Sequence, residues 1–325
     1  MKRFKGFLAG LLTVLALVAM LPFIAGNYAL TVGAEIAIFV IFAASLHFLM
    51  AVGGLASFGH AAYFGLGAYG VAFLAKMAGL PMIVCILLGP LLGALGAAVF
   101  GAFAVQLSGV YFAMLTLAFA QIVWSIAFQW VAVTGGDNGI LGLWPEKWAA
   151  SPSHFYWLAL GVSAFVVSVL RLITFSPFGY ALRGMRDSPL RSESIGINGK
   201  RIQWTAFIIA GTTAGIGGAL FAYLKGSVFP DNMGISLSVD ALVMVLLGGV
   251  ETVPGAIFGA IVYKALNIWL VSQTDWSKLV LGIFIVLIVV VFPKGIVGVV
   301  ESVMQRRRAA APKAAALSAK MEGAQ

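Results

Sequence analysis

The side chains able to do acid–base, metal or nucleophilic chemistry are few in this 325-residue chain: 11 acidic residues, three histidines and one cysteine, Cys85. A single cysteine excludes an intrachain disulfide and a cysteine-built zinc site. No phosphate-binding glycine loop is present, because Gly199-Lys200 is followed by Arg201 and has no glycine at the required distance upstream. The His-Glu-x-x-His run and the Gly-x-Ser-x-Gly turn of hydrolases are also missing. We therefore expect no catalytic constellation, no cofactor and no enzymatic activity.

Several ionisable residues lie within or near long apolar stretches, where a charge is costly. They are Glu35, His47, His60, Asp240, Glu251 and Lys264. An unpaired charge at membrane depth costs roughly 2.5–3.5 kcal/mol, so each should line a polar path, find a partner or reach an interface. Asp240 and Lys264 are candidates for an ion pair, and Glu35 for a structural role near the end of its helix. His60 could face a cavity or lie at the membrane interface. Glu251 could lie near a translocation path or at an interfacial helix end.

The elements that must hold these residues follow from composition. Hydrophobic residues make up 62% of the chain and charged residues 10%, against about 25% charged residues in an ordinary soluble domain. This excludes a soluble enzyme and a disordered chain. Because about 20 apolar residues cross the hydrocarbon core, the sequence predicts ten transmembrane helices, of which the eighth and ninth are short and interrupted by glycine. Their limits are Phe7 to Ala25, Ala29 to Met50, Ala61 to Gly79, Met82 to Val105, Val110 to Val133, Phe155 to Thr174, Trp204 to Leu224, Leu237 to Val250, Gly255 to Leu270 and Trp276 to Phe292.

The basic residues indicate an orientation for these helices. The net charge of +9 comes from clusters at the N-terminus, between Arg171 and Arg201, and from Lys294 onward. With ten spans and the N-terminus inside, fifteen Lys and Arg lie on the cytoplasmic side and four on the outer side. We therefore expect both termini in the cytoplasm and the basic tail in contact with membrane lipid. The same distribution argues against nucleic acid as a partner.

An internal repeat is indicated when the chain is compared with itself at an offset of 195 residues. Residues 52–63 then align with residues 247–258, with three of twelve positions identical. In transporters, corresponding glycine-interrupted segments of duplicated units flank the substrate path. The path candidates are Gly53, Gly54, His60 and Tyr63 in the first segment, Gly248, Gly249 and Glu251 in the second, and Asp240 in the span before it. Chance similarity between glycine-rich segments is the alternative, and parallel and inverted repeats both stay open.

Five sequence blocks, taken together, resemble a known family. Residues 53–69 read GGLASFGHAAYFGLGAY, and four further blocks follow in order: GVYFAMLTLAFAQ at 109–121, TGGDNGI at 134–140, SPFGYALRGMR at 176–186 running on to SIGIN at 194–198, and LGGVETVPGA at 247–256. Over about residues 30 to 300 the set resembles the permease subunits of branched-chain amino acid ABC importers, of the LivM type in the LivH/LivM permease family.

This resemblance implies an all-α polytopic protein of the bacterial inner membrane, with some helices short or broken. Residues 1–28 would form an N-terminal membrane helix, 29–305 the permease transmembrane domain, and 306–325 a basic, disordered cytoplasmic tail. The implied partners are a second homologous permease, two ATP-binding subunits that hold the ATP, and a periplasmic solute-binding protein that meets an outer surface including residues 134–148. Branched-chain amino acids, urea, short amides and aromatic acids all stay open as solutes.

The loop of residues 175–203 is the longest predicted cytoplasmic connection, and its alternating basic and apolar residues predict short helices on the membrane surface. The resemblance implies that it holds the coupling helix that docks on an ATPase, with Arg183, Arg186, Asp187, Glu193 and Gly196 as coupling residues. Serines at 192 and 194 depart from the commoner Glu-Ala-Ala form of this motif. A basic loop that only enforces topology is the alternative.

Two other function classes compete with an importer subunit. A stand-alone ion-coupled secondary transporter would use residues such as Asp240 and Glu251 for coupling, but it has no need of an ATPase-docking helix. An intramembrane enzyme is disfavoured because no catalytic cluster is present. The sequence therefore favours a permease that makes no chemical bond and works by alternating access.

Overall fold

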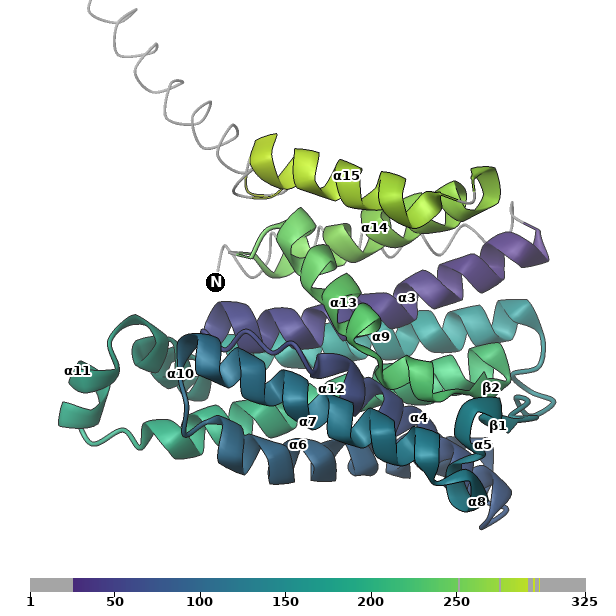
Figure 1. Cartoon of the computed structure of the whole chain (residues 1–325), viewed down its shortest axis with the longest axis horizontal. Coiled ribbons are helices and arrows are strands. Elements are labelled where there is room, and N and C mark those ends of the chain that lie inside the picture. The colour runs from purple at the N-terminus through teal and green to yellow at the C-terminus, as the bar shows by residue number, and fades with distance from the viewer. Residues whose placement is uncertain (1–25, 251, 275, 292–294, 296–297, 299–325) are drawn as a thin grey trace, which may run out of the picture. The chain divides into compact units, whose positions relative to one another are not determined.

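The computed structural model describes residues 26–250, 252–274, 276–291, 295 and 298 (Figure 1). These residues are almost entirely helical, apart from two short strands. The elements are α3 (Asn27–His47), η1 (Phe48–Val52), α4 (His60–Lys76), α5 (Met82–Leu88), α6 (Pro90–Ala104), α7 (Gly109–Gln129), α8 (Val131–Thr134), η2 (Gly136–Asn138), β1 (Ile140–Leu141), α9 (Pro152–Thr174), α10 (Pro177–Asp187), α11 (Pro189–Ser194), α12 (Gly199–Lys225), β2 (Ser227–Val228), η3 (Pro230–Met233), α13 (Ile235–Gly248), α14 (Val253–Gln273) and α15 (Ser277–Val291).

Within the described residues, six helical segments are long and apolar enough to cross a membrane. They are Asn27–Val52, Met82–Ala104, Gly109–Gln129, Pro152–Thr174, Gly199–Lys225 and Pro254–Gln273. The predicted all-α polytopic membrane fold is therefore confirmed. The predicted number of ten spans is not established, because residues 7–25 lie outside the described part and α4, α13 and α15 have 17, 14 and 15 residues.

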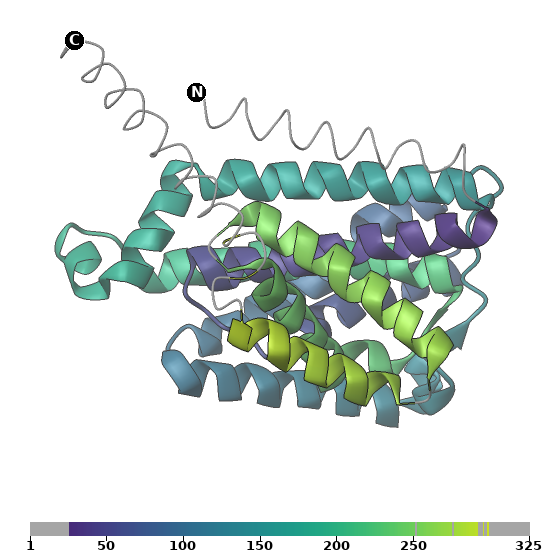
Figure 2. The same ribbon diagram turned by 90° about the horizontal axis from the view of Figure 1, so that it is seen from above.

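The chain divides into two compact units, the first ending at Ala241 and the second beginning at Leu242. In the first unit α12 packs against α4, α6 and α3, and α3 packs against α9. Figure 2 shows α9 at one edge of this unit, beside α3. Glycine allows the closest approach: a Cβ on Gly218 of α12 would lie 1.8 Å from the Phe64 carbonyl oxygen of α4. Such backbone proximity is how small residues join membrane helices.

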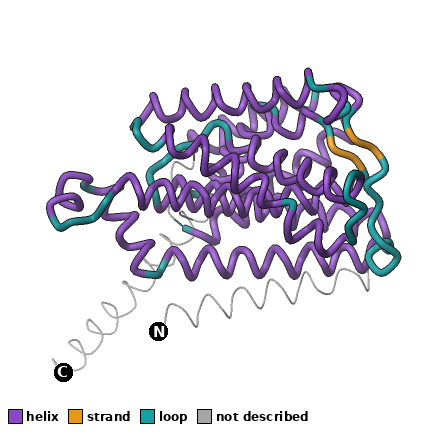
Figure 3. The backbone as a smooth tube through the Cα atoms, turned by 90° about the horizontal axis from the view of Figure 1, so that it is seen from below, coloured by secondary structure: helices purple, strands orange, loops and turns teal. Residues whose placement is uncertain are grey.

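The two ends of the first unit differ. At one end, α10 and α11 project beyond the long helices (Figure 1). At the opposite end, β1 and β2 form an antiparallel pair in which Ile140 faces Val228 and Leu141 faces Ser227 (Figure 3). The expected short helices in the 175–203 loop are thus present as α10 and α11. The predicted start of the following helix at Trp204 is corrected, because α12 begins at Gly199.

The second unit contains the end of α13 together with α14 and α15. The end of α13 and the start of α14 approach closely, since a Cβ on Gly248 would lie 1.7 Å from the Gly255 carbonyl oxygen. Gly249 has a φ of +109°, a backbone conformation that side-chain-bearing residues rarely adopt. Gly54 in the first unit has a φ of +69° at the equivalent place in its own Gly-Gly pair. A positive φ thus occurs at the second glycine of both Gly-Gly pairs.

Candidate functional site

The first candidate site is a break between α3 and α4. The helix widens to a π turn at Phe48–Val52 and then stops, and helical structure resumes only at His60. The last backbone bonds run from Gly53 N to Leu49 O, from Gly54 N to Met50 O and from Leu55 N to Leu49 O. A π turn within an α-helix is rare and is frequent at functional sites, and broken helices line substrate paths in transporters. Gly53 and Gly54, both path candidates, lie in this break.

Polar side chains from several helices meet the start of α4. His60 is fully buried, and its Nε2 lies 2.8 Å from Ser45 Oγ of α3. Its ring stacks on Phe42 at 5.6 Å between centroids. Ser238 Oγ of α13 accepts a hydrogen bond from Ala61 N at 3.0 Å, and Thr116 Oγ1 of α7 accepts one from Phe58 N at 3.2 Å. Small hydroxyl side chains therefore tie the break to α3 and to two further helices, α7 and α13.

Two buried polar atoms at this break have no hydrogen-bond partner within the described part of the chain: Ser57 Oγ and His60 Nδ1. A buried polar group without a partner is unfavourable, so water or a polar group of a passing solute would be stabilised here. The other path candidate, Tyr63, is also buried and makes edge contacts with His60 and with Phe207 of α12 at 6.0 and 5.4 Å. The arrangement can form hydrogen bonds with uncharged polar groups. The described residues of this site include no catalytic pair.

None of the contacts just described brings the other path candidates, Asp240, Gly248 and Gly249, to this site. Asp240 lies on α13 two residues after Ser238, whereas Gly248 and Gly249 belong to the second unit. Glu251 lies outside the described residues. The predicted pair of Asp240 and Lys264 stays a prediction.

The structural role expected for Glu35 is supported by an ion pair. Its Oε2 lies 2.7 Å from Nζ of Lys225, which joins α3 to the end of α12.

The predicted coupling loop is the second candidate site. Ser176 Oγ accepts a hydrogen bond from Gly179 N at the start of α10, and α11 ends at Ser194. Two large apolar side chains on the projecting end are almost fully exposed, Leu190 at 78% and Ile195 at 77%. Gly196 follows the end of α11 with a φ of +87°, and a Cβ there would meet nothing within 4 Å. Exposed apolar side chains of this kind mark interaction surfaces, and a left-handed glycine is a common way for a helix to end.

The charged coupling candidates differ in what they touch. Glu193 is exposed on α11. The Arg183 guanidinium lies over the rings of Phe175 and Tyr180, at 5.2 and 5.6 Å. Arg186 forms an ion pair with Asp187 at 2.8 Å and also donates from Nη1 to the backbone oxygen of Ala51 in η1. Arg186 thus connects the loop with the break.

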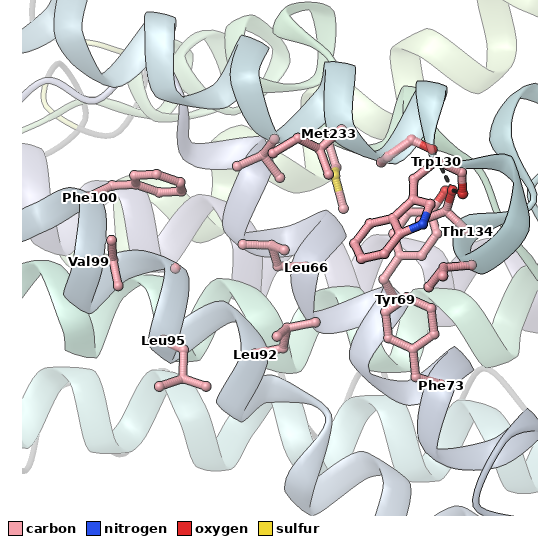
Figure 4. A pocket seen from close by; sticks show the side chains of 15 residues that line it. Leu66, Tyr69, Phe73, Leu92, Leu95, Val99, Phe100, Trp130, Thr134 and Met233 are labelled. Atoms are coloured by element: carbon pink, nitrogen blue, oxygen red, sulfur yellow. Dashed lines mark hydrogen bonds between the residues drawn. The ribbon is translucent and has the colours of Figure 1, made fainter.

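Two pockets lie in the first unit, away from both sites. The larger, of about 340 Å³, is lined by α4, α6, α7 and η3 and is almost wholly apolar. Figure 4 shows Tyr69, Phe73 and Trp130 near one end and Leu95, Val99 and Phe100 near the other. Its lining has no charged side chain to bind a zwitterion. Sequence reasoning placed the path elsewhere, and none of its path candidates lines this pocket.

The smaller pocket, of about 270 Å³, is polar and lies at the strand end of the first unit. It is lined by Lys76, Trp144, Glu146 and Tyr223 among others. The Glu146 carboxylate accepts hydrogen bonds from Met82 N at 2.7 Å and from Trp148 Nε1 at 2.9 Å. This carboxylate therefore caps the start of α5. No group of three or more His, Cys, Asp or Glu that could hold a metal occurs in the part of the chain that the structure describes.

Sequence reasoning missed several residues of these sites. Ser45, Thr116 and Ser238 escaped notice because isolated hydroxyl residues are common in membrane helices. They usually bond their own helix, as Ser45 Oγ also does with Phe42 O at 2.7 Å. The inward contact of Arg186 has no signal in the sequence, since an arginine in a basic loop looks the same whichever way it points.

Comparison with known proteins gives consistent matches. The family model described as "Branched-chain amino acid transport system / permease component" matches residues 28–290. The high-affinity branched-chain amino acid transport system permease protein LivM of Escherichia coli (strain K12) is 27% identical over 93% of this chain and 77% of its own length. LivH of Salmonella typhimurium, of the same transport system description, is 24% identical over 52% and 59%. The autoinducer 2 import system permease protein LsrC of Escherichia coli (strain K12 / DH10B) is 30% identical over 44% and 45%. No solved structure matches significantly.

Proposed function

Because the chain belongs to the branched-chain amino acid transport system permease family, we propose that it forms a translocation path for branched-chain amino acids in the bacterial inner membrane, driven by separate ATPase subunits. The chain is a multi-pass membrane permease and not an enzyme. The family match along residues 28–290 carries this proposal. The pairing of LivM and LivH descriptions among the relatives supports a second permease subunit as a partner.

The projecting end of the first unit supports the proposed ATPase contact. Leu190 and Ile195 are exposed at the tip, next to a glycine whose backbone no side-chain-bearing residue readily adopts. In the proposed mechanism, ATP-driven closure of two ATP-binding subunits moves α10 and α11, and the helices of the permease rock between inward-open and outward-open states. The permease itself binds no ATP.

The opposite end supports the proposed contact with a periplasmic solute-binding protein. Residues 134–148 surround β1 and include exposed Trp144 and Glu146 of the polar pocket. The proposed orientation puts the six basic residues of positions 171–201 in the cytoplasm and Lys76, Lys147 and Lys225 outside. Both termini would then be cytoplasmic, with the basic tail on anionic lipid.

Uptake of radiolabelled leucine tests the proposal. The host lacks its own branched-chain uptake systems and expresses this chain with a candidate second permease, ATP-binding proteins and solute-binding protein from the same source organism. We expect uptake that requires the ATP-binding proteins and that survives a protonophore in a short assay. Uptake without those proteins, abolished at once by the protonophore, would instead show a secondary transporter. Parallel assays with urea, acetamide and benzoate test the other solutes.

A further inference from the structure

The end of η1 leaves the backbone oxygen of Ala51 without its helical partner. In a continuing α-helix, Ala51 O would accept from Leu55 N, four residues on. Leu55 N donates instead to Leu49 O, because the chain turns at Gly54. The guanidinium of Arg186 takes the vacant place and donates from Nη1 to Ala51 O. A charged donor makes a stronger hydrogen bond than a neutral one, so this contact closes the helix end firmly.

The backbone of the break is shaped to receive the Arg186 side chain. A Cβ on Gly54 would lie 2.6 Å from Arg186 Cγ, so the glycine makes the space that the arginine stem fills. One turn earlier on α10, the buried Leu182 lies with Cδ1 3.7 Å from the place of a Cβ on Gly53. Asp187 Oδ1 accepts a hydrogen bond from Arg186 Nε at 2.8 Å, which fixes the guanidinium group. Both residues of the Gly-Gly pair therefore face α10.

The helix that carries Arg186 packs against the ends of two long helices. At the turn from α9 into α10, a Cβ on Gly179 would lie 2.3 Å from Thr174 O. Met185 Cε lies 2.0 Å from the place of a Cβ on Gly199, at the start of α12. A push on α11 that moves α10 therefore also acts on η1, through the bond from Arg186 to Ala51 O.

We propose that Arg186 is a positioning residue that ties the docking loop to the broken span, so that movement of α10 displaces residues 53–59 and thereby His60 and Ser57. The Arg186 side chain is 41% exposed, and the role we assign to it is the bond to Ala51 O of η1, not a contact with the ATPase. This inference rests on the proposed function and adds the route by which the loop reaches the broken span.

The test measures how accessible position 57, within the break, is to a thiol reagent. Ser57→Cys is introduced into the full chain with Cys85→Ala, and the chain is purified with its ATP-binding partners in lipid nanodiscs. The rate of reaction with N-ethylmaleimide is measured with and without ATP and vanadate. With Arg186 present, we expect trapping to change the rate at least threefold. Arg186→Ala should abolish this change while the ATP-binding partners still co-purify, and Arg186→Lys, which keeps a cationic donor, should restore part of it.

Lys200→Ala is the matched control, because Lys200 is an exposed cation of the same loop, at the start of α12, to which no coupling role is assigned. It should respond to trapping as the parent does. A parent-like response in Arg186→Ala, loss of the ATP-binding partners from it, an equal loss of response in Lys200→Ala, or no response in the parent would each overturn the inference. If Arg186→Ala does not fold, a failure of Arg186→Lys to respond at all would do so. Absence of any ATP-binding partner from the parent would instead contradict the proposed function.

Discussion

Gly196 is the residue at which the docking turn is most sensitive. Its φ of +87° costs a side-chain-bearing residue about 1–2 kcal/mol, and its Cβ position is open on all sides within 4 Å. The Gly196→Val variant should therefore fold normally, but its backbone at position 196 should disfavour the left-handed turn that docking requires. We expect near-normal abundance in the membrane and roughly tenfold weaker binding of the ATP-binding subunits. Co-purification with those subunits measures it.

Gly79→Val is the control for this prediction. Gly79 also has a positive φ, +62°, with no atom within 4 Å of a Cβ, but it lies between α4 and α5 at the other end of the unit. The same backbone strain there should leave ATPase binding unchanged. If both variants bind alike, the Gly196 turn is not part of the docking surface.

Two residues show which features of the site could be predicted from the sequence and which could not. The left-handed backbone at Gly196 could be predicted, because a glycine after a short helix is the usual residue for that turn. The contact of Arg186 with Ala51 could not, since the two residues are 135 positions apart. Only the folded chain shows that the π turn leaves an oxygen at the place where α10 presents a guanidinium.

At the scale of elements, glycines set the distance between α4 and α12. Gly218→Ala would place a Cβ 1.8 Å from Phe64 O, and backbone cannot move aside as a flexible side chain can. We expect a loss of about 1–3 kcal/mol in stability, seen as a lower apparent melting temperature in detergent. Gly161→Ala on α9, where a Cβ meets nothing within 4 Å, should leave that temperature unchanged. Equal melting of the two variants would show that α4 and α12 are not closely packed.

The positions of the helices were largely predictable, and their ends less so. Apolar length located α3, α7 and α9 because each is a long unbroken run. The start of α12 at Gly199 was missed, since Gly-Lys-Arg reads as loop although Asn198 Oδ1 accepts from Arg201 N and caps a helix there. The π turn at the end of α3 leaves no pattern in hydropathy. Strained or polar backbone of this kind depends on tertiary contacts that composition does not encode.

At the scale of the whole molecule, charge and architecture agree. The six basic residues of positions 171–201 lie around the end of the first unit that carries α10 and α11, while Lys76 and Lys225 lie at the end that carries the strands. This separation is the pattern expected when one end faces the cytoplasm. An ATP-driven permease with this orientation must meet its ATP-binding protein at α11 and never at the strand end.

Site-specific photo-crosslinking in intact cells tests this requirement most directly. A photoreactive phenylalanine analogue replaces Ile195 at the exposed tip or, as the control, Trp144, which is 74% exposed at the opposite end. The cells express the chain with the same candidate second permease, ATP-binding proteins and solute-binding protein as in the uptake assay. We predict that position 195 crosslinks to an ATP-binding subunit and that position 144 does not. A chain that crosslinks to that subunit from position 144, or from neither position while it still transports leucine, would contradict the assignment of α10 and α11 as the site through which ATP drives this permease.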